Sequence, residues 1–200
     1  MFEPGQLGAS LIFTATIAIS LVGLFLVPAI IEQCLFRPYW FLRKKQPASV
    51  FLSGFVHADL GHLLMNMLTF WFFGFPLEAR TGTLPFVMLY AIGLVASSIY
   101  TLYRHANEPD YATLGASGAI AAVLFAYIVY DPLSTLYIIP FPVPIPAFLF
   151  AVAYLAYTYW AANQERGRIN HDAHLWGAIS GLLFVAVYDP AAWGRLLRLF

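Results

Sequence analysis

Four side chains that could carry out acyl transfer stand near the beginnings of apolar segments in this chain. Ser117 and His174 each begin one such segment, and His62 and Asn66 lie in the first turns of a third. A serine hydroxyl is a poor nucleophile until a nearby base takes its proton, and the pKa of a histidine ring is ordinarily close enough to neutrality for that task. Polar groups at membrane depth are costly and usually functional. These residues therefore predict a serine hydrolase with Ser117 as nucleophile and His174 as base.

The same segments offer hydrogen-bond donors for an oxyanion. His62 and Asn66 are four residues apart, so they share one face of a helix. Both side chains can donate, and so can the backbone N–H of Ser117, because the first N–H groups of a helix have no partner within it. Asp172 lies only two residues from His174 and would point elsewhere on a helix. We therefore expect a Ser–His dyad without an acid.

Small residues surround these groups. Gly115 and Gly118 flank the serine, where they allow a tight turn and the close approach of a substrate backbone. Close helix packing is the alternative reading of such residues in a membrane, and we expect it for Gly177 and Gly181. His57 is either a supporting residue of the site or a residue of the preceding loop.

The composition predicts an integral membrane protein. Of the 200 residues, 61% are hydrophobic and 10% are charged, whereas soluble domains carry about 25% charged residues. The length suits one domain over residues 1–200. The net charge of zero gives no indication of a nucleic-acid partner, and the single cysteine, Cys34, excludes an internal disulfide.

Six apolar segments approach the roughly 20 residues that a helix needs to cross a bilayer. They are about Leu7–Ile31, Leu60–Leu77, Leu84–Tyr103, Gly115–Tyr130, Ala147–Trp160 and Ala173–Tyr188. The sequence therefore predicts an all-α, polytopic membrane protein with six transmembrane helices. Helices two, four and six cross in the same direction, so His62, Ser117 and His174 should lie at a similar depth near one membrane face.

The segment around the fifth helix has two further features. Prolines occupy every second position from Pro140 to Pro146, which excludes a helix interior and predicts an extended stretch. Aromatic residues then gather near the end of this helix, where they are typical of an interfacial belt. They are Tyr154, Tyr157, Tyr159 and Trp160.

These motifs resemble those of the rhomboid intramembrane serine proteases, and the resemblance covers helices two to six. The matching motifs, in order, are His57-x4-His62-x3-Asn66, Gly115-Ala116-Ser117-Gly118 and Ala173-His174-x2-Gly177-x3-Gly181. Glu78-x-Arg80 is similar to a structural ion pair of that family.

The resemblance implies a six-helix, rhomboid-like bundle with a water-filled cavity and an intramembrane serine endopeptidase activity. The implied site contains Ser117 as nucleophile, His174 as base, the oxyanion donors His62, Asn66 and the Ser117 amide, and the supporting residues Gly115, Gly118 and His57. It implies no metal and no cofactor. The implied substrates are transmembrane segments of other proteins, which would enter past the fifth helix. Since no long targeting extension precedes the first span, we expect a multi-pass protein of a bacterial inner membrane.

The chain departs from the family in two places. Many bacterial relatives have Trp-Arg where this chain has Ala48-Ser49, and many have an aromatic residue at the position of Ala121, against which the base stacks. His174 must therefore be held in another way, and the cluster Asn170-His171-Asp172 is a candidate.

The charges disagree with the family's orientation. Seven basic residues belong to loops on the motif side, namely Arg37, Arg43, Lys44, Lys45, Arg104, Arg166 and Arg168. The positive-inside rule would place that side in the cytoplasm, whereas the family's catalytic face usually looks outward. We expect the family's orientation, with the C-terminus in the cytoplasm.

Three other functions remain as alternatives. A catalytically silent rhomboid-like scaffold would bind transmembrane helices without cutting them. A zinc-dependent hydrolase would use the five histidines and Asp172, although H-E-x-x-H is absent. A small transporter is disfavoured, because the chain lacks paired broken helices in two matching halves.

Overall fold

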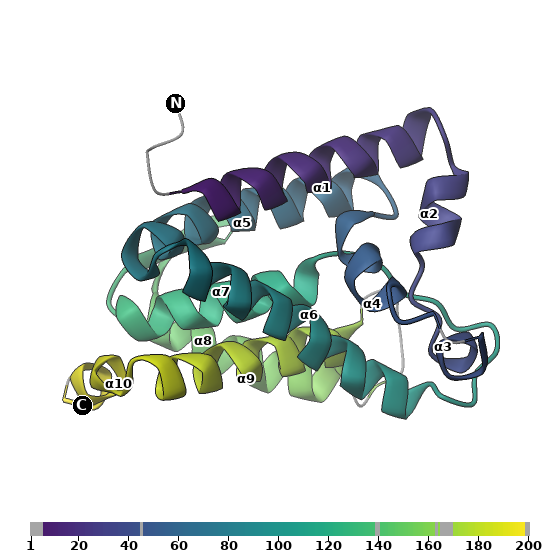
Figure 1. Ribbon diagram of the computed structural model, residues 1–200. Helices are drawn as coiled ribbons and strands as arrows, with labels where there is room; N and C mark the ends of the chain where they lie inside the picture. Colours follow the sequence, from purple (N-terminus) through teal and green to yellow (C-terminus); the bar gives the residue numbers. More distant parts are fainter. Residues whose placement is uncertain (1–5, 45, 139–140, 163, 165–169, 199–200) are drawn as a thin grey trace.

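The computed structural model describes residues 6–44, 46–138, 141–162, 164 and 170–198 (Figure 1). The helices are α1 (Leu7–Phe25), α2 (Ala29–Cys34), α3 (Pro38–Lys44), α4 (Ser49–Leu52), the 3-10 helix η1 (Ser53–Phe55), α5 (Leu60–Thr81), α6 (Thr83–Arg104), α7 (Ser117–Tyr130), α8 (Ala147–Ala162), α9 (His171–Tyr188) and α10 (Pro190–Leu197). Two strands, β1 (Thr135–Ile138) and β2 (Phe141–Pro146), complete the described elements.

The predicted helical membrane bundle is confirmed, and the helices differ in length. Within the described ranges, α1, α5 and α6 are long and apolar enough to cross a membrane, while α9 and α10 form a pair bent by 106°. The other two predicted spans are shorter, since α7 has 14 residues and α8 has 16. At 1.5 Å per residue they reach about 21 and 24 Å, which is less than a hydrocarbon core of about 30 Å.

The first predicted span is too long at its end. The prediction ran to Ile31, but α1 ends at Phe25 and a separate short helix, α2, begins at Ala29. Pro28 explains the break, because proline has no N–H for the helix ladder and disfavours helical geometry in the residue before it.

The expected ion pair between Glu78 and Arg80 is replaced by other contacts among the described residues. The carboxylate of Glu78 is fully buried and accepts hydrogen bonds from the backbone N–H groups of Gly8 and Ala9. It therefore caps the beginning of α1, where the helix leaves donors without partners. The guanidinium of Arg80 lies 4.8 Å from the ring centre of Tyr130 instead.

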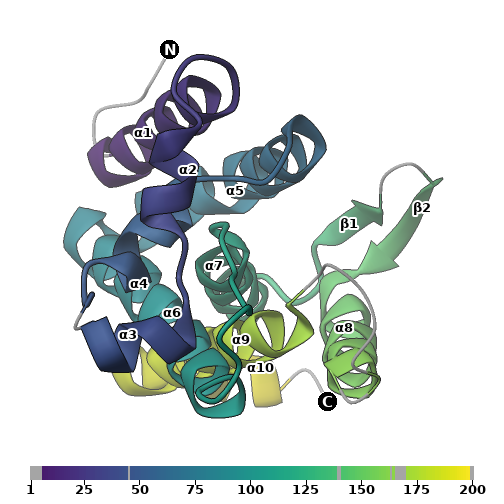
Figure 2. The same cartoon turned by 90° about the vertical axis from the view of Figure 1, so that its right-hand side faces the viewer.

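Helix α7 occupies the middle of the bundle, with α5, α6 and α9 around it (Figure 2). Every residue from Gly118 to Ala126 is buried. Helix α8 packs on the outer side of α9, next to the hairpin of β1 and β2. This arrangement gives the beginning of α7 neighbours on several sides.

The predicted extended stretch before the fifth helix is confirmed over Phe141–Pro146, which forms one strand of an antiparallel hairpin, while Pro140 lies outside the described residues. Leu136 pairs with Ile145 and Thr135 with Pro146, where β2 leads into α8. Prolines are tolerated here because a two-stranded sheet consists of edge strands only.

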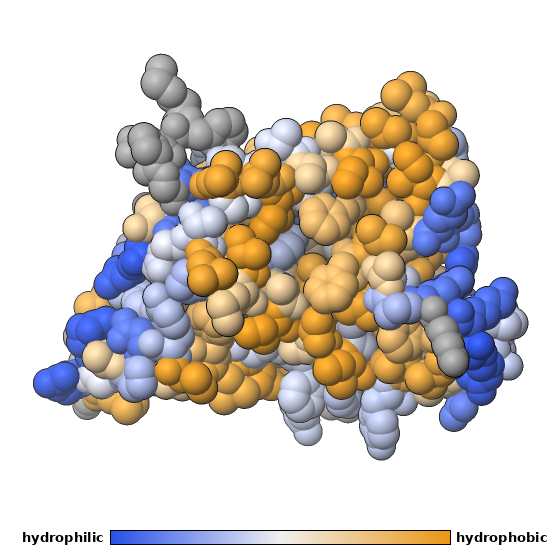
Figure 3. Space-filling view, viewed as in Figure 1, coloured by the Kyte–Doolittle hydropathy of each residue, from blue (hydrophilic) through white to orange (hydrophobic). Residues whose placement is uncertain are grey.

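The surface agrees with a position in lipid. Figure 3 shows a broad hydrophobic face over α1 and α6, and a hydrophilic patch over α3. The short helices α2 to α4 therefore belong to a loop at one end of the bundle, on the same side as the beginnings of α5, α7 and α9 (Figure 1).

Candidate active site

The beginnings of α7 and α9 are in direct backbone contact. A Cβ atom added to Gly177 would lie 2.0 Å from the carbonyl oxygen of Gly118, and one added to Gly181 would lie 2.1 Å from that of Ala122. A Cβ atom on Gly118 would in turn approach the carbonyl oxygen of Ala173 to 3.2 Å. Gly118 follows the predicted nucleophile and Ala173 precedes the predicted base, so this packing brings together the backbones that carry both.

The loop before α7 places His62 beside the same helix start. Gly115 has φ +108°, a left-handed conformation that favours glycine, and its N–H donates to the carbonyl of Ser53 at 2.9 Å. The ring of His62 fills the space that a side chain would take, because a Cβ on Gly115 would lie 2.6 Å from its Cε1. His62 on α5 thereby packs against Gly115, two residues before Ser117.

Asn66 lies one turn below His62 on α5, as its spacing predicted. The amide is buried, and its Nδ2 donates to the carbonyl of His62 at 2.9 Å. An Asn amide carries two N–H bonds. One of them therefore fixes the side chain against its own helix, and the second is the donor that an oxyanion could use.

His57 is buried between α1 and the site. Its Nδ1 lies 3.0 Å from the hydroxyl of Ser20, and its ring meets that of His62 edge to face with centres 4.9 Å apart. Burial, aided by the neighbouring His62, lowers the pKa of His57 to about 3, so the ring is neutral at physiological pH. His57 thus packs directly against His62, between that ring and α1.

The start of α9 is anchored by the cluster singled out from the sequence. Asn170 caps the helix by accepting from the N–H of Ala173 at 3.0 Å, and it donates to the hydroxyl of Thr101 at 3.0 Å. Asp172 is buried and forms an ion pair with Arg104 at 2.9 Å. The carboxylate of Asp172 therefore pairs with the last residue of α6. The cluster as a whole fixes the helix turn that bears His174.

One aromatic residue near the site was assigned wrongly from the sequence. Tyr154 was placed in an interfacial belt, but its ring lies nearly parallel to that of His174, with an interplanar angle of 19° and centres 6.5 Å apart. Ala121 belongs to the same packed cluster, so its small side chain leaves room for a ring supplied by α8. Phe150 and Tyr154 lie on the same face of α8 as the buried Ala147, but a helix that is apolar on nearly every side gives no sequence signal for this face.

The candidate nucleophile, base and oxyanion donors differ in their exposure. Ser117, His174 and His62 are each half-buried, whereas Asn66 and His57 are buried behind them. The N–H of Ser117 is in the first turn of α7, where helix donors point outward without an intrahelical partner. Over the described part of the chain, no three His, Cys, Asp or Glu side chains are grouped to hold a metal ion.

Comparisons with known proteins agree with these motifs. Residues 44–190 match the family model of the rhomboid domain. RHOMBOID-like protein 12, mitochondrial, of Arabidopsis thaliana is 29% identical over 161 residues, which cover 73% of this chain and 45% of the relative. Rhomboid protein 1, mitochondrial, of Saccharomyces cerevisiae is 32% identical over 143 residues, which cover 68% of this chain and 40% of the relative.

The human presenilin-associated rhomboid-like protein, mitochondrial, is 30% identical over 149 residues, which cover 71% of this chain and 38% of the relative. The matches thus span less than half of each relative's length. All three relatives are named as mitochondrial proteins, which disagrees with the bacterial inner membrane expected from the sequence, while the multi-pass membrane character stands. From the extent of the domain match and these relatives, the chain belongs to the rhomboid family.

Proposed function

We propose that this protein is an intramembrane serine endopeptidase that cleaves transmembrane segments of other membrane proteins. The observation that carries the proposal is the glycine contact between α7 and α9, which joins the backbone next to Ser117 to the backbone next to His174. His62 reaches the same place across Gly115. A nucleophile, a base and oxyanion donors thus come from three helices that are far apart in the sequence.

In the proposed reaction, the Ser117 hydroxyl attacks the scissile carbonyl while His174 takes its proton. The negative charge that develops on the carbonyl oxygen is stabilised by N–H donors from Ser117, His62 and Asn66. His174 then protonates the leaving amine, and the acyl group stays on Ser117. Water attacks this ester with His174 again as base, which releases the new carboxyl end and restores the serine.

The packed core around α7 supports a single membrane domain, which we propose for the whole of residues 1–200. In this proposal, Gly115 lets His62 approach the turn that carries Ser117, and Gly118 lets α6 approach the same turn. His57 acts by supporting His62. The reaction as proposed uses only these side chains and water, so we propose no metal and no cofactor.

Side-by-side cleavage of a model transmembrane substrate by the wild type and by Ser117→Ala and His174→Ala tests the proposal. We expect each substitution to abolish cleavage while thermal unfolding in detergent stays unchanged. The wild type should also react with a serine-directed fluorophosphonate at Ser117. Full cleavage by either variant would refute the dyad, and a well-folded wild type without labelling or cleavage would favour the silent scaffold.

A further inference from the structure

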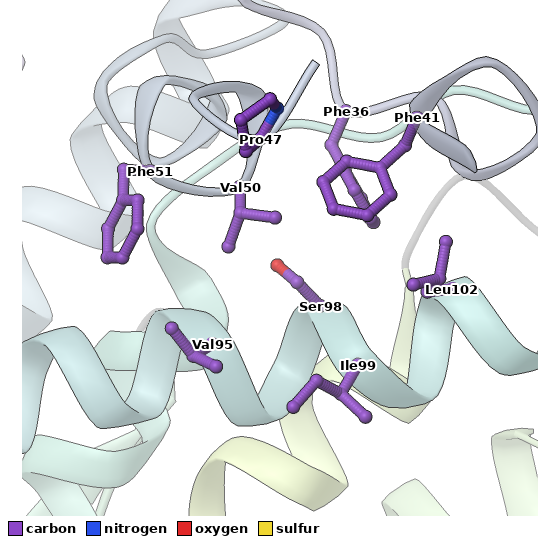
Figure 4. A pocket seen from close by; sticks show the side chains of 9 residues that line it. All are labelled: Phe36, Phe41, Pro47, Val50, Phe51, Val95, Ser98, Ile99 and Leu102. Carbon is purple, nitrogen blue, oxygen red and sulfur yellow. The ribbon is translucent and has the colours of Figure 1, made fainter. Parts of the chain in front are cut away.

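An apolar pocket lies away from the proposed active site, between α6 and the loop helices α3 and α4. Its volume is about 230 Å³. Apolar side chains from both sides form its wall, and the one polar lining residue is Ser98, whose hydroxyl points toward the middle (Figure 4). The lining residues are Phe36, Phe41, Pro47, Val50, Phe51, Val95, Ser98, Ile99 and Leu102.

The size and the lining point to part of a flexible apolar molecule. Pockets that enclose a whole drug-sized ligand measure about 300–1,000 Å³, so this pocket is too small for one. Two of its lining residues, Phe51 and Ile99, are 45% and 60% exposed. Because α6 is long and apolar enough to span a membrane, the open side of the pocket would face the hydrocarbon of a bilayer that α6 crosses.

The position of the pocket along α6 matches one lipid leaflet. Val95 lies nine positions before Arg104, the last residue of α6. At 1.5 Å per residue this is about 14 Å, or about half of a hydrocarbon core of about 30 Å. A chain entering from the membrane surface near Arg104 would therefore follow α6 through the pocket to about the middle of the bilayer.

Two cations stand at the surface end of the pocket. Arg43 and Lys44 end α3, next to the lining residue Phe41. Arg43 donates to the carbonyl of Ala106, one turn beyond the lining residue Leu102. Aromatic rings hold both cations, because the guanidinium lies 3.7 Å from the ring centre of Tyr39 and the Lys44 ammonium lies 4.4 Å from that of Trp40.

The loop that follows α6 carries acidic groups, which limit the positive charge at the surface end of the pocket. Glu108 lies 2.9 Å from Nδ1 of His105, and Asp110 follows it. Arg37 is paired with Glu32. Arg43 and Lys44 are thus exposed basic groups at the end of α3 that form no ion pair among the described residues.

We propose that this pocket binds one acyl chain of an anionic phospholipid, whose phosphate contacts Arg43 and Lys44. The apolar walls take the chain, and the two cations at the membrane surface select the charged headgroup. Basic side chains beside an anionic membrane surface each favour binding by about 1 kcal/mol, or about fivefold. This inference does not depend on the proposed protease activity.

Native mass spectrometry of the detergent-solubilised full chain tests it, with palmitoyl-oleoyl phosphatidylglycerol and phosphatidylcholine as probes. We expect a one-to-one adduct that is about 25-fold tighter with phosphatidylglycerol. Replacing both exposed cations by Arg43→Gln and Lys44→Gln should reduce this affinity to that of phosphatidylcholine. The matched pair Arg195→Gln and Arg198→Gln, at the opposite end of the bundle, should leave it unchanged.

A second variant tests the pocket itself. Ser98→Phe places a ring in the middle of the cavity and should weaken binding of both lipids at least tenfold. Ile92→Phe, at an exposed position of α6 outside the pocket, should leave the binding of both lipids unchanged. Equal affinity for the two lipids in the wild type, or unchanged binding in the charge double variant or in folded Ser98→Phe, would overturn the proposal. The charge variant affects only exposed side chains, so it remains decisive if Ser98→Phe fails to fold.

Discussion

Replacing Gly177 with alanine should separate the two helix starts that form the proposed site. The added Cβ would lie 2.0 Å from the carbonyl oxygen of Gly118, whereas contacts under 3.0 Å are essentially never seen for real Cβ atoms. The obstacle is backbone, so no side chain can turn away. Helices α7 and α9 must therefore move apart by about 1 Å or more at the residue that follows Ser117.

This displacement should lower both the stability of the protein and its rate of cleavage. Overpacking of this kind typically costs about 1–3 kcal/mol. For a protein of this length 1 kcal/mol corresponds to about 2–4 °C in Tm, so a loss of about 2 kcal/mol should lower the Tm by about 4–8 °C. A misplacement of 1 Å in an active site can cost about 100-fold in rate, so cleavage should fall about 100-fold even where the variant remains folded.

The assay compares Gly177→Ala with Gly194→Ala. At Gly194 in α10, the nearest atom to an added Cβ is the flexible end of Arg198 at 3.7 Å, an ordinary contact. We expect Gly194→Ala to keep its Tm and its cleavage rate, and Gly177→Ala to lose about 100-fold in kcat and in fluorophosphonate labelling at temperatures where it remains folded. Wild-type stability and cleavage in Gly177→Ala would refute both the close packing and its role in positioning the dyad.

Four further outcomes are expected. Tyr154→Leu should lower kcat about threefold to tenfold with little change in KM, and Tyr154→Phe should restore it; equal rates in all three proteins would remove the ring from the site. Asn66→Ala should lower kcat by about 100-fold to 1,000-fold, as expected for an oxyanion donor, and an unchanged kcat would exclude that role. Glu78→Ala should lower the free energy of unfolding by about 3 kcal/mol, because charge-assisted bonds to the N–H groups of α1 are lost; a wild-type Tm would contradict the capping. For His57, the pKa of about 3 lies below the ordinary 6.5, so the unfolded chain gains a proton there as the pH falls and the folded chain does not. Lowering the pH from 7 to 5 should therefore cost about 2 kcal/mol of stability through this group, and His57→Gln should show a smaller loss of Tm over that range.

The parts of the fold that could be predicted are those set by local sequence. Apolar length located the six helical segments, and alternating prolines located the extended stretch before α8. The parity of the crossings placed His62, Ser117 and His174 at one end of the bundle. The break after Phe25 was missed although Pro28 marks it, since apolar length alone does not show whether a helix continues.

The contacts that could not be predicted join residues far apart in the chain. Helix α8 is apolar on nearly every side, so its sequence does not reveal which face carries Tyr154 toward His174. The role of Glu78 as a cap depends on α1 lying beside the turn between α5 and α6, about 70 residues away in sequence. Its neighbour Arg80 suggested an ion pair because sequence spacing shows only local partners.

The short outer helix α8 has a consequence for the surrounding membrane. Its outward residues are apolar, with Leu149 and Val152 50% and 67% exposed, yet the helix reaches only about 24 Å. Such hydrophobic mismatch is relieved by local thinning of the bilayer or by tilting of the helix, and each ångström carries a modest cost. A longer transmembrane helix of another protein that diffuses alongside α8 would enter this thinner region of the bilayer. Its end would then extend into water, and its outermost turns would no longer be surrounded by acyl chains.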